Sequence, residues 1–199
     1  MEKVGIVIDN MYLENCASIY QSWPVDIVKL PEILLRPGEE HYKTYIYDAL
    51  PWVPKNGATN EQLEKLRKKK GYLDRLTYYD RIKVDLGYVR TKSHKCRSCG
   101  AVNEVPVQKL VDVKLSIGLL MLAWSSNVEK IILITGDADI LPAVLQCESS
   151  KAIIRLCYVQ EGNVKTSESL IRNCSEKQQL TKEDFQKLYR PDQSFSDST

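Results

Sequence analysis

The stretch "ILITGDADILPAV" (residues 132–144) passes from a run of aliphatic residues to two aspartates that are one position apart. Such a short apolar run predicts a buried strand of a parallel sheet, and Gly136 permits a tight turn and a close approach of the backbone to a ligand. The helix that follows tolerates Pro142 in its first turn. Asp137 and Asp139 are therefore expected at the carboxyl end of a central strand, where α/β sheets build their sites.

Outward from this stretch, short apolar runs alternate with longer helical patterns, which is typical of a parallel sheet covered on both faces. Strands are expected at residues 4–8, 42–47, 83–90, 130–135 and 152–159, and helices at 61–76, 108–124, 141–149 and 167–174. The helix at 108–124 is apolar nearly all round, so it is expected to be buried. The sequence thus predicts an α/β, doubly wound fold with a mainly parallel sheet.

The chain has 199 residues, which fits one domain with its own core. We assign residues 1–180 to this domain and residues 181–199 to a partly flexible tail, because the end of the chain is rich in Ser and Asp. The formal net charge of +2 indicates no general binding of polyanions. No run of about 18 apolar residues occurs, so we expect a soluble, cytoplasmic protein with no membrane partner.

Four of the six cysteines are scattered through apparently regular segments. Such positions favour reduced thiols in the core over disulfides. The four are Cys16, Cys147, Cys157 and Cys174.

Two further acids stand at informative positions. Asp9 directly follows the first strand, and Asp112 lies early in the apolar helix, where Lys109, Asp112 and Ser116 are expected to form a narrow polar strip. Each acid also has a structural explanation as a turn residue, a helix cap or one half of an ion pair, and Asp139 is the obvious cap candidate.

The joint pattern is harder to explain structurally, because carboxylates that converge on one sheet edge repel one another. A hard divalent cation relieves that repulsion, and Mg²⁺ or Mn²⁺ suits an all-oxygen site with few protein ligands and several waters. Such a site fits phosphodiester hydrolysis by metal-activated water.

Three segments together resemble the motifs of NYN domains, in particular the LabA/DUF88 branch of the PIN-like nuclease superfamily. They are "VIDNMYL", "KLVDVKLSIGLLMLA" and "ILITGDADILPAV", and their order and spacing also agree. The resemblance covers about residues 3–175 and implies a doubly wound PIN-like fold with metal-dependent ribonuclease activity. Carried over by motif, the catalytic and metal-binding residues are Asp9, Asp112, Asp137 and Asp139.

The chain departs from the family's pattern at two positions. Tyr12 stands where the family often has Asn, and Gly118 stands where it often has a further acid. These departures bear on turnover rather than on the fold, and Asn10 is a candidate replacement for the missing amide.

The segment before the apolar helix, residues 91–108, is expected to be a small Cys-containing insert. Cys96 and Cys99 have the spacing of a zinc knuckle, and His94 is a third candidate ligand for a structural Zn²⁺. A fourth ligand has to come from His41, a distant cysteine or another subunit. The alternatives are a flexible loop with two exposed thiols and, less favoured, a redox pair.

Basic residues cluster at 65–70 and 90–97. Either cluster is explained by a solvated face, or by contacts with RNA phosphates. Exposed tyrosines nearby would stack on unpaired bases. The candidate RNA-binding residues are Lys68, Lys69, Lys70, Arg90, Lys92 and Lys109, and the tyrosines are Tyr72, Tyr78, Tyr79 and Tyr88.

The leading hypothesis is a Mg²⁺- or Mn²⁺-dependent endoribonuclease that acts on single-stranded or structured RNA. The alternative is a catalytically weakened NYN module that binds RNA or a protein. A nucleotide-binding domain is disfavoured, because no glycine-rich phosphate loop follows the first strand. The sequence leaves the oligomeric state open.

Overall fold

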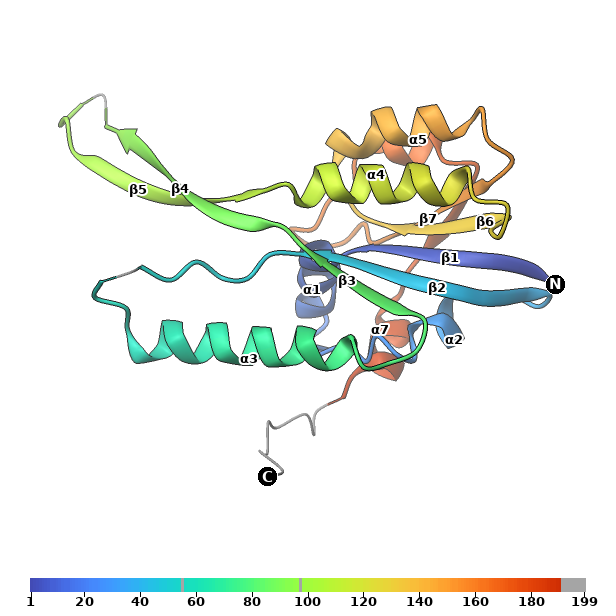
Figure 1. Ribbon diagram of the computed structural model, residues 1–199, viewed down its shortest axis with the longest axis horizontal. Helices are drawn as coiled ribbons and strands as arrows, with labels where there is room; N and C mark the ends of the chain where they lie inside the picture. The colour runs from blue at the N-terminus through green and yellow to red at the C-terminus, as the bar shows by residue number, and fades with distance from the viewer. Residues whose placement is uncertain (55, 97, 191–199) are drawn as a thin grey trace.

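A six-stranded parallel sheet forms the centre of the computed structural model, which describes residues 1–54, 56–96 and 98–190 (Figure 1). Its strand order is β3-β2-β1-β6-β7-β8, and every neighbouring pair is parallel. The strands are β1 (Glu2–Asp9), β2 (Glu39–Asp48), β3 (Ile82–Leu86), β6 (Lys130–Ile134), β7 (Ile153–Tyr158) and β8 (Glu176–Gln179). The order reverses between β1 and β6, so the topological switch point lies between these two strands.

Helices cover both faces of the sheet, which confirms the predicted doubly wound α/β fold (Figure 1). One face carries α1 (Asn10–Ile19), α2 (Leu30–Leu34), α3 (Asn60–Leu76) and α7 (Lys182–Leu188). The other carries α4 (Val111–Ala123), α5 (Leu141–Cys147) and α6 (Glu168–Asn173), and a 3-10 turn, η1 (Ala138–Ile140), precedes α5.

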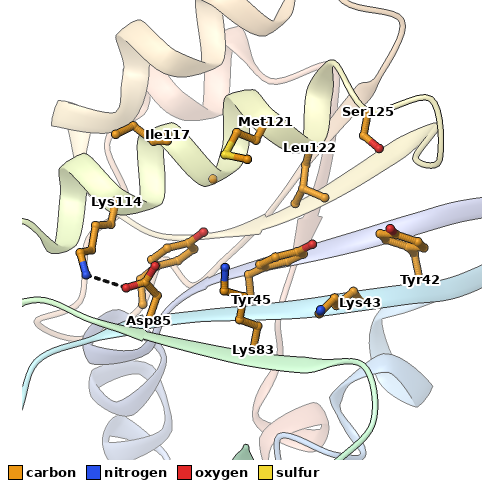
Figure 2. Close-up of a pocket in the computed structure, with 12 residues that line it drawn as sticks. Tyr42, Lys43, Tyr45, Lys83, Asp85, Lys114, Ile117, Met121, Leu122 and Ser125 are labelled. Atoms are coloured by element: carbon orange, nitrogen blue, oxygen red, sulfur yellow. Dashed lines mark hydrogen bonds and ion pairs between the residues drawn. The ribbon is translucent and has the colours of Figure 1, made fainter.

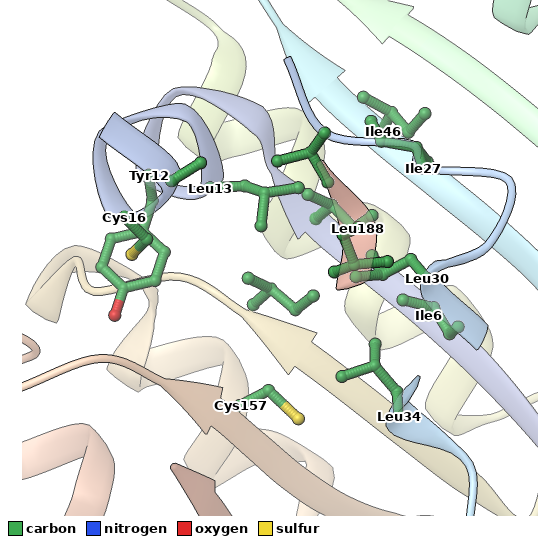
Figure 3. Close-up of a cluster of buried hydrophobic side chains, with 14 of the residues drawn as sticks. Ile6, Tyr12, Leu13, Cys16, Ile27, Leu30, Leu34, Ile46, Cys157 and Leu188 are labelled. Atoms are coloured by element: carbon green, nitrogen blue, oxygen red, sulfur yellow. The ribbon is translucent and has the colours of Figure 1, made fainter. Parts of the chain in front are cut away.

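Strand side chains alternate between the two layers. Ile6 and Ile8 of β1 join the core under α1, whereas Val7 joins the core under α4. Figure 3 shows Ile6 in the first of these cores with Leu13, Leu30 and other aliphatic side chains.

An antiparallel hairpin interrupts the alternation of strands and helices. It consists of β4 (Tyr88–Lys95) and β5 (Val102–Lys109) and projects past the carboxyl ends of the sheet strands (Figure 1). The strand predicted at 83–90 is therefore two strands, β3 and β4, separated by Gly87. Most of the insert is paired as a hairpin and is not an irregular loop, and its two cysteines lie in the turn between the strands.

The predicted burial of the apolar helix is wrong on one side. Leu115 and Leu119 of α4 are buried, but Ile117 and Met121 are 51% and 71% exposed. The reason is that α4 belongs to an outer layer, so only its inner face meets the sheet. Across residues 1–54, 56–96 and 98–190, none of the helices combines the length and the apolar character needed to cross a bilayer.

The segment assigned to a C-terminal tail contains ordered structure at its start. Lys182–Leu188 form α7, and Phe185 and Leu188 are buried in the core. The folded unit thus extends past residue 180, while residues 191–199 lie outside the described residues.

A buried ion-pair network ties the amino ends of four strands together. Arg155 of β7 is fully buried and donates to Glu39 of β2 at 3.0 Å and to Glu176 of β8 at 2.8 Å. Lys130 of β6 pairs with the same two carboxylates, at 2.8 and 3.1 Å. Burial alone would raise the pKa of Glu39, but hydrogen bonds from Arg155 and Lys130 outweigh it and lower the pKa to about 2.

We expect Arg155→Met to lower the free energy of unfolding at pH 7 by about 3–5 kcal/mol, because it leaves Glu39 buried with half of its partners. The depressed pKa of Glu39 stabilises the fold above pH 4.5, and this contribution is lost as the pH falls towards 2. The difference between wild type and variant in urea unfolding should therefore shrink across that range. Arg172→Ala is the control, because its ion pair with Glu168 is exposed and worth at most about 0.5 kcal/mol. A loss for Arg155→Met no larger than that of the control would contradict the expectation.

Candidate active site

The first acid of the site, Asp9, ends β1 at the switch point and is almost fully buried. Its Oδ1 accepts the backbone N–H of Tyr12 at 3.2 Å, so Asp9 is the N-cap of α1. Its Oδ2 accepts from the hydroxyl of Thr135 at 3.3 Å, just after β6. These two bonds fix the carboxylate between the two strands that flank the switch point.

The other three predicted acids are exposed at the same edge. Asp112 lies in the first turn of α4, and Asp137 and Asp139 lie in the turn after β6. Asp137, not Asp139, is the cap here: it is the N-cap of η1 and accepts the N–H of Asp139 at 2.9 Å. The cap interpretation thus holds for Asp9 and Asp137, and caps alone do not explain Asp112 and Asp139.

Asp112 links the acids electrostatically, because it repels Asp9 on one side and is repelled by Asp137 and Asp139 on the other. Burial is the main cause that raises the pKa of Asp9 to about 6. Its two hydrogen bonds lower the pKa, and repulsion from Asp112 raises it further. The pKa of Asp112 is also raised, first by burial and then by Asp137 and Asp139. The structure therefore brings together all four acids named from the sequence.

The donor set is chemically suited to a hard cation. It consists of carboxylate oxygens only, and Mg²⁺ binds through one or two carboxylates while it keeps several waters. Within the described residues, no three Asp, Glu, His or Cys side chains form a ready-made cage for an ion. Only the oxygen chemistry of the four acids, and not a preformed cage among the described residues, would suit a hard cation.

A second polar group beside Asp9 was not predicted. Asp48 ends β2, is buried, and accepts from the Asn10 amide at 2.6 Å and from Lys69 at 2.7 Å. Glu14 of α1 accepts from the same amide at 2.8 Å and pairs with the same lysine. The Oδ1 atom of Asn10 is buried and has no hydrogen-bond partner among the described residues. Asp48 also raises the pKa of Asp9, so this network belongs to the electrostatics of the site.

Lys69 is consequently not available to RNA phosphates, which corrects its predicted role. Its side chain is only 14% exposed because it is held between Glu14 and Asp48. Its neighbour Lys68 remains exposed, and the Nζ atom of Lys68 lies 3.4 Å from Oε1 of Glu64. The run at 65–70 resembled a uniformly solvated face, but one of its positions points inward.

The hairpin and α3 extend on either side of the acid edge (Figure 1). The exposed basic residues of the prediction lie on these two arms: Lys68 and Lys70 on α3, and Arg90, Lys92 and Lys109 on the hairpin. Lys109 therefore belongs to β5 and not to a helical strip with Asp112 and Ser116, which is a correction. A cavity of about 560 Å³ lies between the arms, and Asp48, Lys65, Lys68 and Gln108 are among its lining residues.

Of the four tyrosines predicted to stack on bases, three are exposed: Tyr78, Tyr79 and Tyr88. Tyr72 is buried and contacts Trp23 edge to face, so its predicted role in stacking is wrong.

Tyr12 leaves no gap where the family often has Asn. Its hydroxyl accepts the N–H of Val159 at 2.9 Å and bonds Thr166 at 2.6 Å, so the ring belongs to the core shown in Figure 3. A Cβ on Gly136 would lie 2.5 Å from that ring. The glycine thus accommodates Tyr12, whereas the sequence suggested that it makes room for a ligand.

Gly118 is matched to Tyr47 in the same way. A Cβ at position 118 would overlap the Tyr47 hydroxyl and lie 2.8 Å from its Cζ. The place of the family's further acid is therefore filled by a tyrosine from β2, and the two residues form a complementary pair.

Cys96 and Cys99 lie at the tip of the hairpin with free thiols, while the other four cysteines are buried free thiols, as expected. The turn is closed by Cys96 N to Ala101 O at 2.8 Å and by Gly100 N to Cys96 O at 3.0 Å. The N–H groups of Cys99 and Ser98 point at the Cys96 sulfur and lower its pKa.

His41 pairs with Val4 at the start of β1, at the opposite end of the sheet, so it is not the missing zinc ligand. His94 lies in β4, and its side chain is outside the described part of the chain.

The fold and the site together define a doubly wound α/β domain with an acidic centre at its switch point. The NYN domain model matches residues 3–180, and the chain belongs to this family. NYN domains are part of the PIN-like nuclease superfamily and are generally nucleases. No curated protein matches the sequence.

Asp9→Asn should stabilise the metal-free protein at pH 7.5. The raised pKa means that the unfolded chain loses this proton near pH 3.8 and the folded chain near 6, so Asp9 destabilises the fold increasingly as the pH rises through this window. Asn keeps the acceptor for the N–H of Tyr12 at Oδ1, and its NH2 group can donate to the Thr135 hydroxyl oxygen, so both contacts are retained without the charge. We expect a gain of about 1–3 kcal/mol at pH 7.5 that disappears below pH 4, measured by urea unfolding in EDTA. The same gain at both pH values, or a similar gain for the exposed control Asp80→Asn, would contradict this.

Gly118→Ala should destabilise the protein by about 1–3 kcal/mol, although Ala is normally the better helix former. The added methyl group collides with Tyr47, so the cost should be smaller in a Tyr47→Leu background. Gly71→Ala is the matched control, because a Cβ there meets nothing within 4 Å and should stabilise α3. Thermal unfolding of the four variants measures both effects, and equal behaviour of the two glycines would refute the clash.

Proposed function

We propose that the protein is a Mg²⁺- or Mn²⁺-dependent endoribonuclease whose site is the cluster of Asp9, Asp112, Asp137 and Asp139. The observation that carries the proposal is the electrostatic coupling of these acids at the switch point of an NYN domain. Acids that were merely structural would be paired with bases, as Glu39 is with Arg155. Acids left to repel one another favour a cationic ligand.

Asp9, Asp112 and Asp137 would hold the ion, and Asp139 would orient a water or help to hold a second ion. When bound, the cation supplies a hydroxide-like water at neutral pH and neutralises charge on the phosphate. Asp9 is kept in place by Tyr12 N and Thr135, so its carboxylate is preorganised. Asp137 is similarly fixed by the N–H of Asp139.

The substrate strand would enter between the hairpin and α3. Lys68 and Lys70 on one arm, and Arg90, Lys92 and Lys109 on the other, would contact phosphates of single-stranded or structured RNA. Lys69 is excluded from this set because Glu14 and Asp48 hold it.

The turn at the hairpin tip supports a structural zinc site on Cys96 and Cys99. Two thiols at C-x-x-C spacing, with backbone N–H groups directed at the first sulfur, suit a thiolate–zinc knuckle. Its remaining ligands would come from His94 or from a second chain.

The closed positions 12 and 118 favour one alternative, a weakened module that binds RNA without cutting it. Neither position offers the amide or the acid that the family often has there, because Tyr12 and Tyr47 fill the space. The nuclease assay decides between the two functions.

Asp112→Asn and Asp137→Asn should each reduce cleavage of labelled single-stranded and hairpin RNA in Mn²⁺ by about a hundredfold or more. Asp80→Asn, an exposed acid remote from the edge, should cleave at the wild-type rate. Calorimetry should show Mn²⁺ binding to wild type and its loss in Asp112→Asn. Cleavage unaffected by both site variants would overturn the proposal. RNA binding without cleavage or Mn²⁺ heat would establish the binding module.

A further inference from the structure

A groove lies on the α4 side of the sheet, over the edge formed by β2 and β3 (Figure 2). Its volume is about 350 Å³. Its floor and walls contain three tyrosines and three lysines: Tyr42, Tyr45, Tyr47, Lys43, Lys83 and Lys114. The sequence alone did not predict a binding role for any of these six side chains.

The groove exists because this edge of the sheet is covered on only one face. Ile82 and Val84 of β3 pack into the core under α3, whereas Lys83 and Asp85 between and after them face the groove. The side chains on both faces of parallel strands are normally buried under helices and are mostly aliphatic. Here α4 lies beside the β2–β3 edge, and the exposed floor carries aromatic and basic residues instead.

The side chains combine flat apolar surfaces with positive charge. The Lys43 ammonium lies 5.7 Å from the centre of the Tyr45 ring. Lys114 binds Asp85 at 2.6 Å and the carbonyl of Leu86 at 2.8 Å, and Asp85 is the one acid among the lining residues. Ile117 and Met121, at the exposed side of α4, also line the groove (Figure 2).

One end of the groove lies near the acid edge. Tyr47 is the register partner of Asp9 in the β1–β2 pair, and Lys114 follows Asp112 by two residues in α4. From there the groove runs back along β2 past Tyr45 to Tyr42. A chain bound at the acid site would therefore have the Tyr47 end of the groove beside it.

We propose that this groove binds the single-stranded RNA segment next to the scissile phosphate. Bases stack on Tyr42 and Tyr45 against the apolar wall of α4, and phosphates contact Lys43 and Lys83. The inference rests on the proposed nuclease function and deepens it, because it makes the substrate unpaired on one side of the cut. A protein partner fits less well, because lysine is depleted in the centres of protein interfaces.

Binding of a fluorescent ten-nucleotide RNA, followed by anisotropy in EDTA, tests the groove without cleavage. We expect Tyr45→Leu to weaken binding by about tenfold. Lys83→Ala should weaken it and reduce the slope of log affinity against log salt by about 0.7. Tyr189→Leu and Lys177→Ala are matched controls outside the groove, on a partly exposed tyrosine and on a strand lysine, and should bind within about twofold of wild type.

Wild-type affinity in both groove variants would overturn this inference and leave the nuclease proposal standing. Absence of both RNA binding and cleavage in wild type would overturn the two together. If a variant fails to fold, wild type can instead be crosslinked to RNA that contains 4-thiouridine. Peptides spanning residues 42–47 should then be labelled. Labelling confined to other segments would refute RNA binding in the groove. If sedimentation shows that Met121→Glu dissociates an oligomer while RNA affinity is unchanged, the groove is a protein interface and the inference is wrong.

Discussion

Asp9 carries a charge in a place where water is nearly excluded, and the architecture of the site depends on how that charge is tolerated. Burial raises the pKa of this carboxyl to about 6. The cap on α1 and the bond from Thr135 lower the cost but do not remove it. Asp48, buried at the end of the next strand, would add a second uncompensated charge. Lys69 reaches in from α3 and pairs with it, so the helix is anchored to the sheet at the point where the site needs neutralisation.

The fold and the four acids could be predicted because both leave periodic or local signals. Apolar runs of strand length end in aspartates, and the order of the motifs places those ends at one edge. The network of Asn10, Glu14, Asp48 and Lys69 could not be predicted in the same way. Its bonded pairs are up to 55 residues apart in the sequence, and Lys69 stands in a basic run that looks solvated throughout. Only the packing of α3 against α1 shows which lysine turns inward.

The two departures from the family's pattern have a common physical form. Tyr12 packs on Gly136 and Tyr47 packs on Gly118, so each aromatic ring occupies the space that its glycine leaves. The partners in each pair lie far apart in the chain. In the sequence, Tyr12 therefore looks only like the loss of an amide, and Gly118 only like the loss of an acid. In the structure each pair closes a volume that would otherwise be a cavity beside the acid edge. The departures therefore keep the shape of the edge while they reduce its number of polar ligands.

Two buried carboxylates at opposite ends of the sheet, Glu39 and Asp9, have opposite surroundings. At the amino end, Glu39 is held by Arg155 and Lys130, and its pKa is lowered to about 2. At the carboxyl end, Asp9 receives only a backbone N–H and a hydroxyl among the described residues, and its pKa is raised to about 6. Both arrangements occur in one compact domain, so the chain is able to satisfy a buried acid fully. An edge where acids stay unsatisfied lowers the stability of the metal-free fold, and a bound cation would recover that loss. The contrast between Glu39 and Asp9 thus distinguishes an acid whose charge is neutralised within the fold from one whose charge is not.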